Sequence, residues 1–293
     1  MGLGDDSPPR NWISPVLQCG LGNRLFQFAA AAGAAEQLGR PLVFYMPECM
    51  RADHGSVATL FRLYPSVPIV TEFAGAASSV EPINIREAAA AIYTFCPFAD
   101  ALAAAPATHG RPVLVHGFRQ SPRYFPAGPE ALNPAWDGAL GGALIRHSLE
   151  AELGLNTDAG RSSAVALHVR LGDYKHLPHH LIGLKNYYAA ALARVEPGQR
   201  IILFSDEPAV AIRLLGSTGA PIVAAPARSD VESLYQMSRC LGGTITANST
   251  FSWWGAWFAH AAGAAWATFP DKWHQRAVAA DLFPSWGTVI AVE

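Results

Sequence analysis

Two residues of one segment have the types and spacing to hold a phosphate group. His168 and Arg170 are two positions apart in the segment HVRLGDY, so on an extended chain both side chains point to the same face. Arginine stays charged, and its planar fork of donors binds phosphate oxygens at two points. Asp173 follows three residues later and offers an alternative, a structural ion pair with Arg170. The segment therefore predicts a phosphate contact or an ion pair, with Gly172 as the turn that follows.

A second segment, GLGNR at residues 20–24, is typical of a turn between a strand and a helix. Gly22 and its neighbour Gly20 allow backbone N–H groups to approach an anion at the positive end of the helix, beside Asn23. The dinucleotide fingerprint is incomplete, because Leu25 stands where a third glycine is needed. A tight turn that only packs the helix on its sheet is the alternative.

A third segment, ANSTFSWWGAW at residues 247–257, precedes and begins a helix-like pattern. Asparagine and serine are common N-cap residues, and the segment offers Asn248, Ser249 and Thr250 at this place. Their polar side chains and the first N–H groups of the helix are suited to hold a second phosphate. The tryptophans follow helical spacing, so we expect them in the core.

The histidines His176, His179 and His180 raise the question of a metal site. Pro178 disrupts a helical presentation of these side chains, and neither cysteine nor carboxylate accompanies them at ligand spacing. The chain also contains no D-x-D triplet. We therefore expect no metal, and expect Arg170 and backbone dipoles to meet any phosphate charge.

The second half of the chain predicts the elements that position these residues. Strand and helix patterns alternate from residue 163 onward, which is typical of a doubly wound α/β sheet with ligands at the carboxyl ends of its strands. The predicted strands are Ala164–Val169, Arg200–Phe204, Pro221–Ala224 and Thr244–Ala247. The predicted helices are Asn186–Val195, Pro208–Leu215, Val231–Cys240 and the segment from Ser249 onward.

The first half is less regular but also alternates between strand and helix. The predicted elements are a strand at Val16 and Leu17, a helix over Leu25–Leu38, strands over Leu42–Tyr45 and Pro112–Phe118, and helices near Ile85–Tyr93 and over Asp137–Leu155. The polar stretch Asn156–Ser163 is the best candidate for a boundary. We therefore expect two domains, residues 1–157 and 158–293.

Composition excludes several classes of protein. The chain has 293 residues, of which 51% are hydrophobic and 15% charged, and a net charge of -2, so neither disorder nor a nucleic-acid partner is expected. Four cysteines without CxxC spacing disfavour a zinc site and a disulfide framework. Met1–Arg10 lacks the pattern of a signal peptide, and polar residues interrupt the uncharged stretch Thr244–Pro270. We expect a cytoplasmic chain without an integral membrane segment; peripheral membrane association stays open.

Together these motifs resemble glycosyltransferase family 11, the α-1,2-fucosyltransferases. Residues 20–29 resemble the family's GGLGNQ-type turn and helix, and residues 168–174 its H-x-R-R-G-D-Y motif. Phe204-Ser205-Asp206 resembles its S-D-D motif, and residues 247–257 are similar to ANSSFSWWGAW almost residue for residue.

The resemblance implies two Rossmann-like domains of GT-B type that face a cleft. It implies metal-independent, inverting transfer of L-fucose from GDP-β-L-fucose, without a cofactor, to the 2-hydroxyl of a glycan acceptor such as a terminal β-galactoside. Residues 1–157 would lie on the acceptor side, and residues 158–293 would bind the donor. The implied contacts are Arg170 and His168 with the pyrophosphate, Asp206 with the nucleoside, Asn248, Ser249 and Thr250 with the phosphates, and Gly22 and Asn23 with the fucose or diphosphate.

Three departures from the family pattern leave alternatives open. Cys19 stands where the family's first motif begins with glycine, and Arg24 stands where that motif has glutamine. Leu171 stands where the H-x-R-R-G-D-Y motif has its second arginine. Arg24 is our hypothesis for the missing cation, and Asp173 and His168 are the candidates for the general base. The alternatives are another inverting fucosyltransferase, of α-1,6 or O-fucosyl type, and a noncatalytic nucleotide-sugar or glycan-binding protein.

Overall fold

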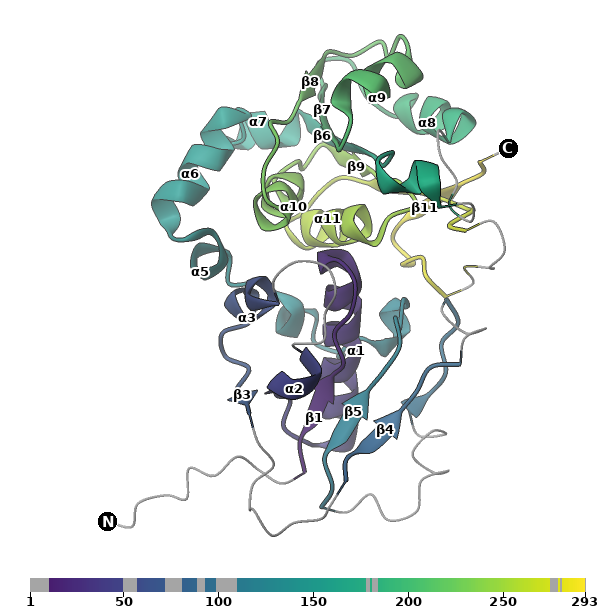
Figure 1. The fold of residues 1–293 in the computed structure, drawn as a ribbon. Helices are drawn as coiled ribbons and strands as arrows, with labels where there is room; N and C mark the ends of the chain where they lie inside the picture. The colour runs from purple at the N-terminus through teal and green to yellow at the C-terminus, as the bar shows by residue number, and fades with distance from the viewer. Residues whose placement is uncertain are drawn as a thin grey trace. The chain divides into compact units, whose positions relative to one another are not determined.

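The computed structural model describes residues 11–49, 57–71, 81–88, 93–98, 110–177, 180, 184–274, 279 and 281–292. The chain divides into two compact units, Met1–Ala135 and Trp136–Glu293. Both units contain parallel strands and helices (Figure 1). The α/β class is therefore confirmed, and the cleft stays a prediction.

The first unit is built on short parallel strands. Its three-stranded sheet has the order β1-β5-β4, formed by β1 (Ile13–Pro15), β5 (Val113–Val115) and β4 (Ile83–Ile85). A parallel bridge from Ile13 to Leu42 lies beside a two-stranded sheet of β2 (Phe44–Tyr45) and β3 (Ile69–Val70). Since β1, β4 and β5 are parallel, their carboxyl ends meet at one edge.

One long helix, α1 (Leu21–Leu38), covers this sheet. Its alanines pack into the same buried cluster as Ile13 and Val113, and Gly39 ends the helix in the left-handed conformation at φ 59°. Gly33 is required on this helix, because a Cβ there would lie 1.9 Å from the carbonyl oxygen of Tyr124. The remaining described helices of the unit are α2 (Met46–Cys49), α3 (Ala58–Leu63) and the 3-10 helices η2 (Pro122–Tyr124) and η3 (Pro129–Leu132).

Several predictions for the first unit need correction. The first strand ends at Pro15, before the predicted Val16, and α1 begins one turn before the predicted Leu25. The helix predicted near Ile85–Tyr93 is wrong at its start, because Ile83–Ile85 is a strand with a buried, exposed, buried pattern. Residues 89–92 of that prediction lie outside the described residues.

The second unit contains a six-stranded parallel sheet with the order β11-β10-β9-β6-β7-β8. Its strands are β6 (Ala164–Val169), β7 (Arg200–Ser205), β8 (Ile222–Ala224), β9 (Gly243–Ile245), β10 (Ala267–Pro270) and β11 (Thr288–Ile290). The chain starts at β6, adds β7 and β8 on one side, and then crosses to add the other three strands. This is the predicted doubly wound topology, with its switch point between β6 and β9.

Helices cover both faces of this sheet (Figure 1). Val165, Leu167 and Val169 of β6 pack with the tyrosines of α8 (Lys185–Leu192) and with Ala211 of α9 (Pro208–Leu215). Ala164 and Ala166 face the opposite side and pack with Met237 of α10 (Asp230–Ser238). Helix α11 (Thr250–Ala261) lies against α10, where a Cβ at Gly255 would be 2.7 Å from the Met237 methyl group.

The division between the units falls before the boundary predicted at residue 157. The helix predicted over Asp137–Leu155 is two helices, α5 (Trp136–Leu140) and α6 (Ala143–Glu152), separated by Gly141 and Gly142 at φ 89° and 119°. The predicted boundary stretch itself contains helix α7 (Asp158–Ser162).

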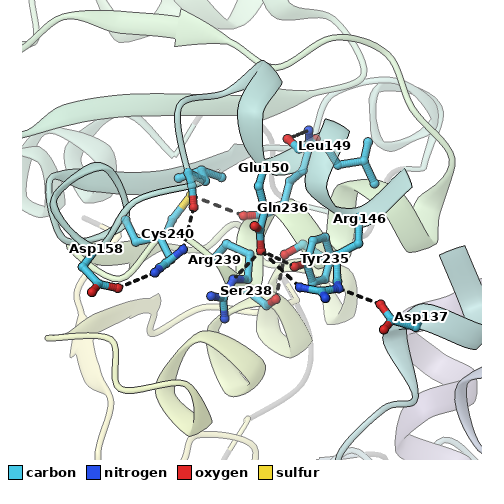
Figure 2. A network of polar contacts seen from close by, with 12 residues as sticks. Asp137, Arg146, Leu149, Glu150, Asp158, Tyr235, Gln236, Ser238, Arg239 and Cys240 are labelled. Carbon is cyan, nitrogen blue, oxygen red and sulfur yellow. Dashed lines mark hydrogen bonds and ion pairs between the residues drawn. The ribbon is translucent and has the colours of Figure 1, made fainter. Parts of the chain in front are cut away.

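A buried carboxylate attaches α5 and α6 to the second unit (Figure 2). Glu150 of α6 is 5% exposed and accepts a 2.5 Å hydrogen bond from the Tyr235 hydroxyl of α10. Arg239 Nε lies 3.3 Å from the same oxygen, and Arg146 Nη1 lies 3.9 Å from it. Arg146 also pairs with Asp137 of α5 through Nε at 2.6 Å. These contacts explain why the division precedes α5.

No helix in the described part of the chain combines the length and apolar character needed to span a membrane.

Candidate donor-binding site

The switch point of the second unit brings together the ends of two adjacent strands. Arg170 directly follows β6, and Thr246–Asn248 follow β9 and lead into α11. In doubly wound sheets, ligands bind at this place, outside the carboxyl ends of the strands. Strands β6 and β7 pair in a register that puts Val169 opposite Ser205. The residues that follow, Arg170 and Asp206, therefore lie side by side, which brings Asp206 into the group.

Arg170 lies between two carboxylates. Its Nη1 is 3.1 Å from Asp206 Oδ2, and its Nη2 is 2.6 Å from Asp173 Oδ1. Asp206 is fixed further, since its Oδ1 accepts the Leu171 N–H at 3.0 Å, and Gly172 leaves room for its Oδ2. Asp173 is more exposed than Asp206, at 57% against 24% of its side chain. The predicted ion pair between Arg170 and Asp173 is therefore present.

His168 is buried beneath this group. It is 5% exposed, its ring lies 5.7 Å from that of Phe251, and its Nδ1 has no hydrogen-bond partner among the described residues. Burial and, secondly, the Arg170 charge lower its pKa from 6.5 to about 3. His168 is therefore neutral at pH 7, where it is a weak base but retains one N–H donor.

The segment before α11 is held by side chains from several elements. Asn248 is 2% exposed, and its Nδ2 donates to the Trp273 carbonyl at 3.2 Å. The Tyr174 hydroxyl donates to the Asn248 carbonyl at 3.2 Å and contacts Ser249, and burial raises its pKa to about 12. Ser249 is the N-cap, but its side chain makes no capping hydrogen bond. The first N–H groups of α11 therefore keep the partial positive charge of a helix N-terminus.

Gly22, Asn23 and Arg24 lie in the first unit, in the first turn of α1. Asn23 Oδ1 accepts a 2.7 Å hydrogen bond from Gln120 Nε2. Arg24 is only 2% exposed, and this burial does not favour the hypothesis that it replaces the second motif arginine. Cys19, before the helix, has φ 61°, a left-handed conformation that glycine adopts without strain.

The second unit thus brings together His168, Arg170, Asp173, Asp206, Asn248, Ser249 and Thr250. Sequence reasoning missed Tyr174 as a support for this site, although it closes the same motif. Among the described residues, no three His, Cys, Asp or Glu side chains are grouped so that they could hold a metal ion. His180 stacks on Tyr174 with ring centroids 4.0 Å apart, and His179 lies outside the described residues.

Two solved structures share the fold of the chain. The α-1,6-fucosyltransferase NodZ co-crystallized with GDP has a TM-score of 0.50 at 16% identity, with 85% of this chain and 92% of that chain covered. Another structure, fucosyltransferase NodZ from Bradyrhizobium, has a TM-score of 0.50 at 16% identity, with 85% of this chain and 92% of that chain covered. At this identity, the likeness shows the fold alone.

Sequence comparison adds a relative and a family. The O-antigen biosynthesis glycosyltransferase WbnK of Escherichia coli is 33% identical over 120 residues. These residues are 38% of this chain and 37% of that protein, so the matched part spans well under half of the relative's length. The family model described as Glycosyl transferase family 11 matches residues 143–287. The unit that holds the Arg170 site is therefore the part of the chain that matches glycosyl transferase family 11.

Proposed function

We propose that the chain is an inverting fucosyltransferase that transfers L-fucose from GDP-β-L-fucose to the 2-hydroxyl of a glycan acceptor such as a terminal β-galactoside. The product is an α-1,2 linkage. The observation that carries the proposal is Arg170 at the switch point of the doubly wound sheet, within the residues that match the family model.

Arg170 serves the leaving group in this proposal. Asp206 holds one side of its guanidinium, while the exposed Asp173 gives way to the more highly charged diphosphate. Asn248, Ser249 and Thr250 bring the positive end of α11 to the phosphates. The role of Asp206 is then to position Arg170, in addition to the nucleoside contact that the family resemblance implies.

The reaction is a single displacement. The acceptor oxygen forms a bond to C1 of fucose while the bond from C1 to the diphosphate oxygen breaks, and GDP leaves with the electron pair. The acceptor proton passes to a base. Asp173 is the better candidate than His168, because the Asp173 carboxylate is exposed to an incoming acceptor, whereas His168 is 5% exposed. A carboxylate released from Arg170 when the diphosphate binds is free to accept it.

Product linkage tests the proposal. The purified chain is incubated with GDP-fucose and a panel of β-galactosides, with and without EDTA, and the products are analysed by methylation and NMR. We expect α-1,2-linked fucose and the same rate in EDTA. An α-1,6 or protein-linked product supports the other fucosyltransferase types, and no acceptor-dependent GDP release supports a noncatalytic binding protein. The panel includes O-antigen fragments, because WbnK is named for O-antigen biosynthesis.

A further inference from the structure

Two neighbouring strands of the second unit, β6 and β9, part at the switch point of the sheet. Their pairing ends with Leu167 opposite Ile245. On the β9 side, Thr246 donates its N–H to β10, so the next residue, Ala247, has its N–H on the side of β6. One further step of the same parallel register would join the Ala247 N–H to the His168 carbonyl.

The structure gives each of these two backbone groups to a side-chain hydroxyl instead. The Ala247 N–H donates to Ser252 Oγ at 3.1 Å, and the Tyr188 hydroxyl of α8 donates to the His168 carbonyl at 2.9 Å. Ser252 and Tyr188 are both buried. Burial raises the pKa of Tyr188 well above its ordinary value, so the hydroxyl keeps the proton that it donates.

The two hydroxyls thus prevent a hydrogen bond that would form directly beside the candidate site. A buried N–H and a buried carbonyl need partners, and without the hydroxyls these two groups would have each other within reach. Such a bond would extend the pairing of β6 and β9 by one step. It would draw Asn248 and the N-terminus of α11, which follow Ala247, toward the segment that carries Arg170.

We infer that Ser252 and Tyr188 are positioning residues, which hold the ends of β6 and β9 apart so that a diphosphate fits between Arg170 and the N-terminus of α11. This inference rests on the proposed function, which supplies a donor with a diphosphate. In this role neither residue contacts the reacting atoms, because each acts through the backbone group that it binds.

A double-mutant cycle of Ser252→Ala and Tyr188→Phe tests the role, with the melting temperature and the dissociation constant of GDP measured for every variant. Each single substitution takes the partner from one buried backbone group, so we expect the melting temperature to fall by several degrees. In the double variant the two released groups can pair with each other. We therefore expect it to melt no lower than the less stable single variant, while the dissociation constant of GDP rises roughly tenfold.

Tyr187→Phe and Ser238→Ala are the matched controls. Tyr187 is the neighbour of Tyr188 on α8, and its hydroxyl donates to the Thr268 carbonyl at 3.0 Å. The Ser238 hydroxyl of α10 donates to the Tyr235 carbonyl at 2.6 Å. Both substitutions remove a buried hydrogen bond to another carbonyl. We expect their effects on the melting temperature to add, and the dissociation constant of GDP to stay that of the wild type.

The outcomes separate this role from the proposed function. Losses of melting temperature that add fully in the double variant of Ser252 and Tyr188 overturn the role, and so does a GDP dissociation constant that stays within about threefold of the wild type. A wild-type chain that binds GDP but transfers no fucose overturns the proposed function alone. A wild-type chain that does not bind GDP overturns both.

Discussion

At the scale of single residues, the neutral state of His168 links the stability of the protein to pH. Its pKa is about 3 in the folded chain against an ordinary value of 6.5, so on acidification the unfolded chain binds the proton first. The contribution of His168 to stability is complete above pH 6.5. It is lost as pH falls from 6.5 toward 3, by about 1.4 kcal/mol for each pH unit.

We therefore expect His168→Gln to flatten the pH dependence of the free energy of unfolding between pH 6.5 and 4. Urea denaturation at a series of pH values measures this slope. His147→Gln, on the exposed surface of α6, is the matched control and should keep the slope of the wild type. An unchanged slope in His168→Gln would show that His168 binds its proton at the same pH in the folded and the unfolded chain, and would contradict its lowered pKa.

The sequence predicted one partner of Arg170 but not the other. Asp173 is three residues away, so local spacing suffices to predict the ion pair. Asp206 reaches Arg170 only because β6 and β7 pair in a register that puts Val169 opposite Ser205. Such a register is a tertiary property, and local patterns do not specify it.

At the scale of elements, the turn before α1 contains a strained residue. Cys19 has φ 61°, and the left-handed conformation costs an L-residue about 1–2 kcal/mol. We expect Cys19→Gly to raise the free energy of unfolding by about 1 kcal/mol, since the flexibility of glycine in the unfolded chain offsets part of the gain. Chemical denaturation measures the change. Cys96→Gly, at an exposed cysteine without a positive φ, should not raise the free energy of unfolding. An equal change in the free energy of unfolding at both positions would refute the strain argument.

Glu150 tests the attachment of α6 to α10. Its carboxylate accepts a 2.5 Å hydrogen bond from the Tyr235 hydroxyl and lies near two arginines. Burial and this hydrogen bond raise the pKa of Tyr235 to about 12. We expect Glu150→Gln to lower the free energy of unfolding by about 2 kcal/mol, as for a lost hydrogen bond to a charged group. Fucose transfer should persist below the melting temperature. Glu196→Gln at an exposed position is the control, and equal stability of the two variants would contradict a structural role for this network.

Sequence patterns predicted the elements of the second unit better than those of the first. Strand Ala164–Val169 and helix Pro208–Leu215 have the predicted bounds, because a regular alternation of apolar strands and amphipathic helices marks them. Strands of two or three residues, such as β3 and β4, are too short for such a pattern. Strands β10 and β11 complete the sheet and were not predicted.

At the scale of the whole molecule, the near-neutral charge of the chain agrees with a site made of a few placed groups. A net charge of -2 provides no general attraction for an anion, whereas Arg170 and the N-terminus of α11 act locally. The two compact units divide before Trp136, whereas the sequence analysis places the boundary after residue 157. The contacts that attach α6 to α10 join residues such as Glu150 and Tyr235, which lie far apart in the chain.

The measurement that tests the central claim most directly is turnover of GDP-fucose by Arg170→Ala. Arg170 contacts the leaving diphosphate in our proposal, so its loss should lower kcat about a hundredfold or more, as for a missing donor to a developing negative charge. The melting temperature and the rate of Arg213→Ala, at an exposed position of α9, serve as controls and should match the wild type. Turnover within a few-fold of the wild-type rate in Arg170→Ala would contradict the assignment of this site to the donor.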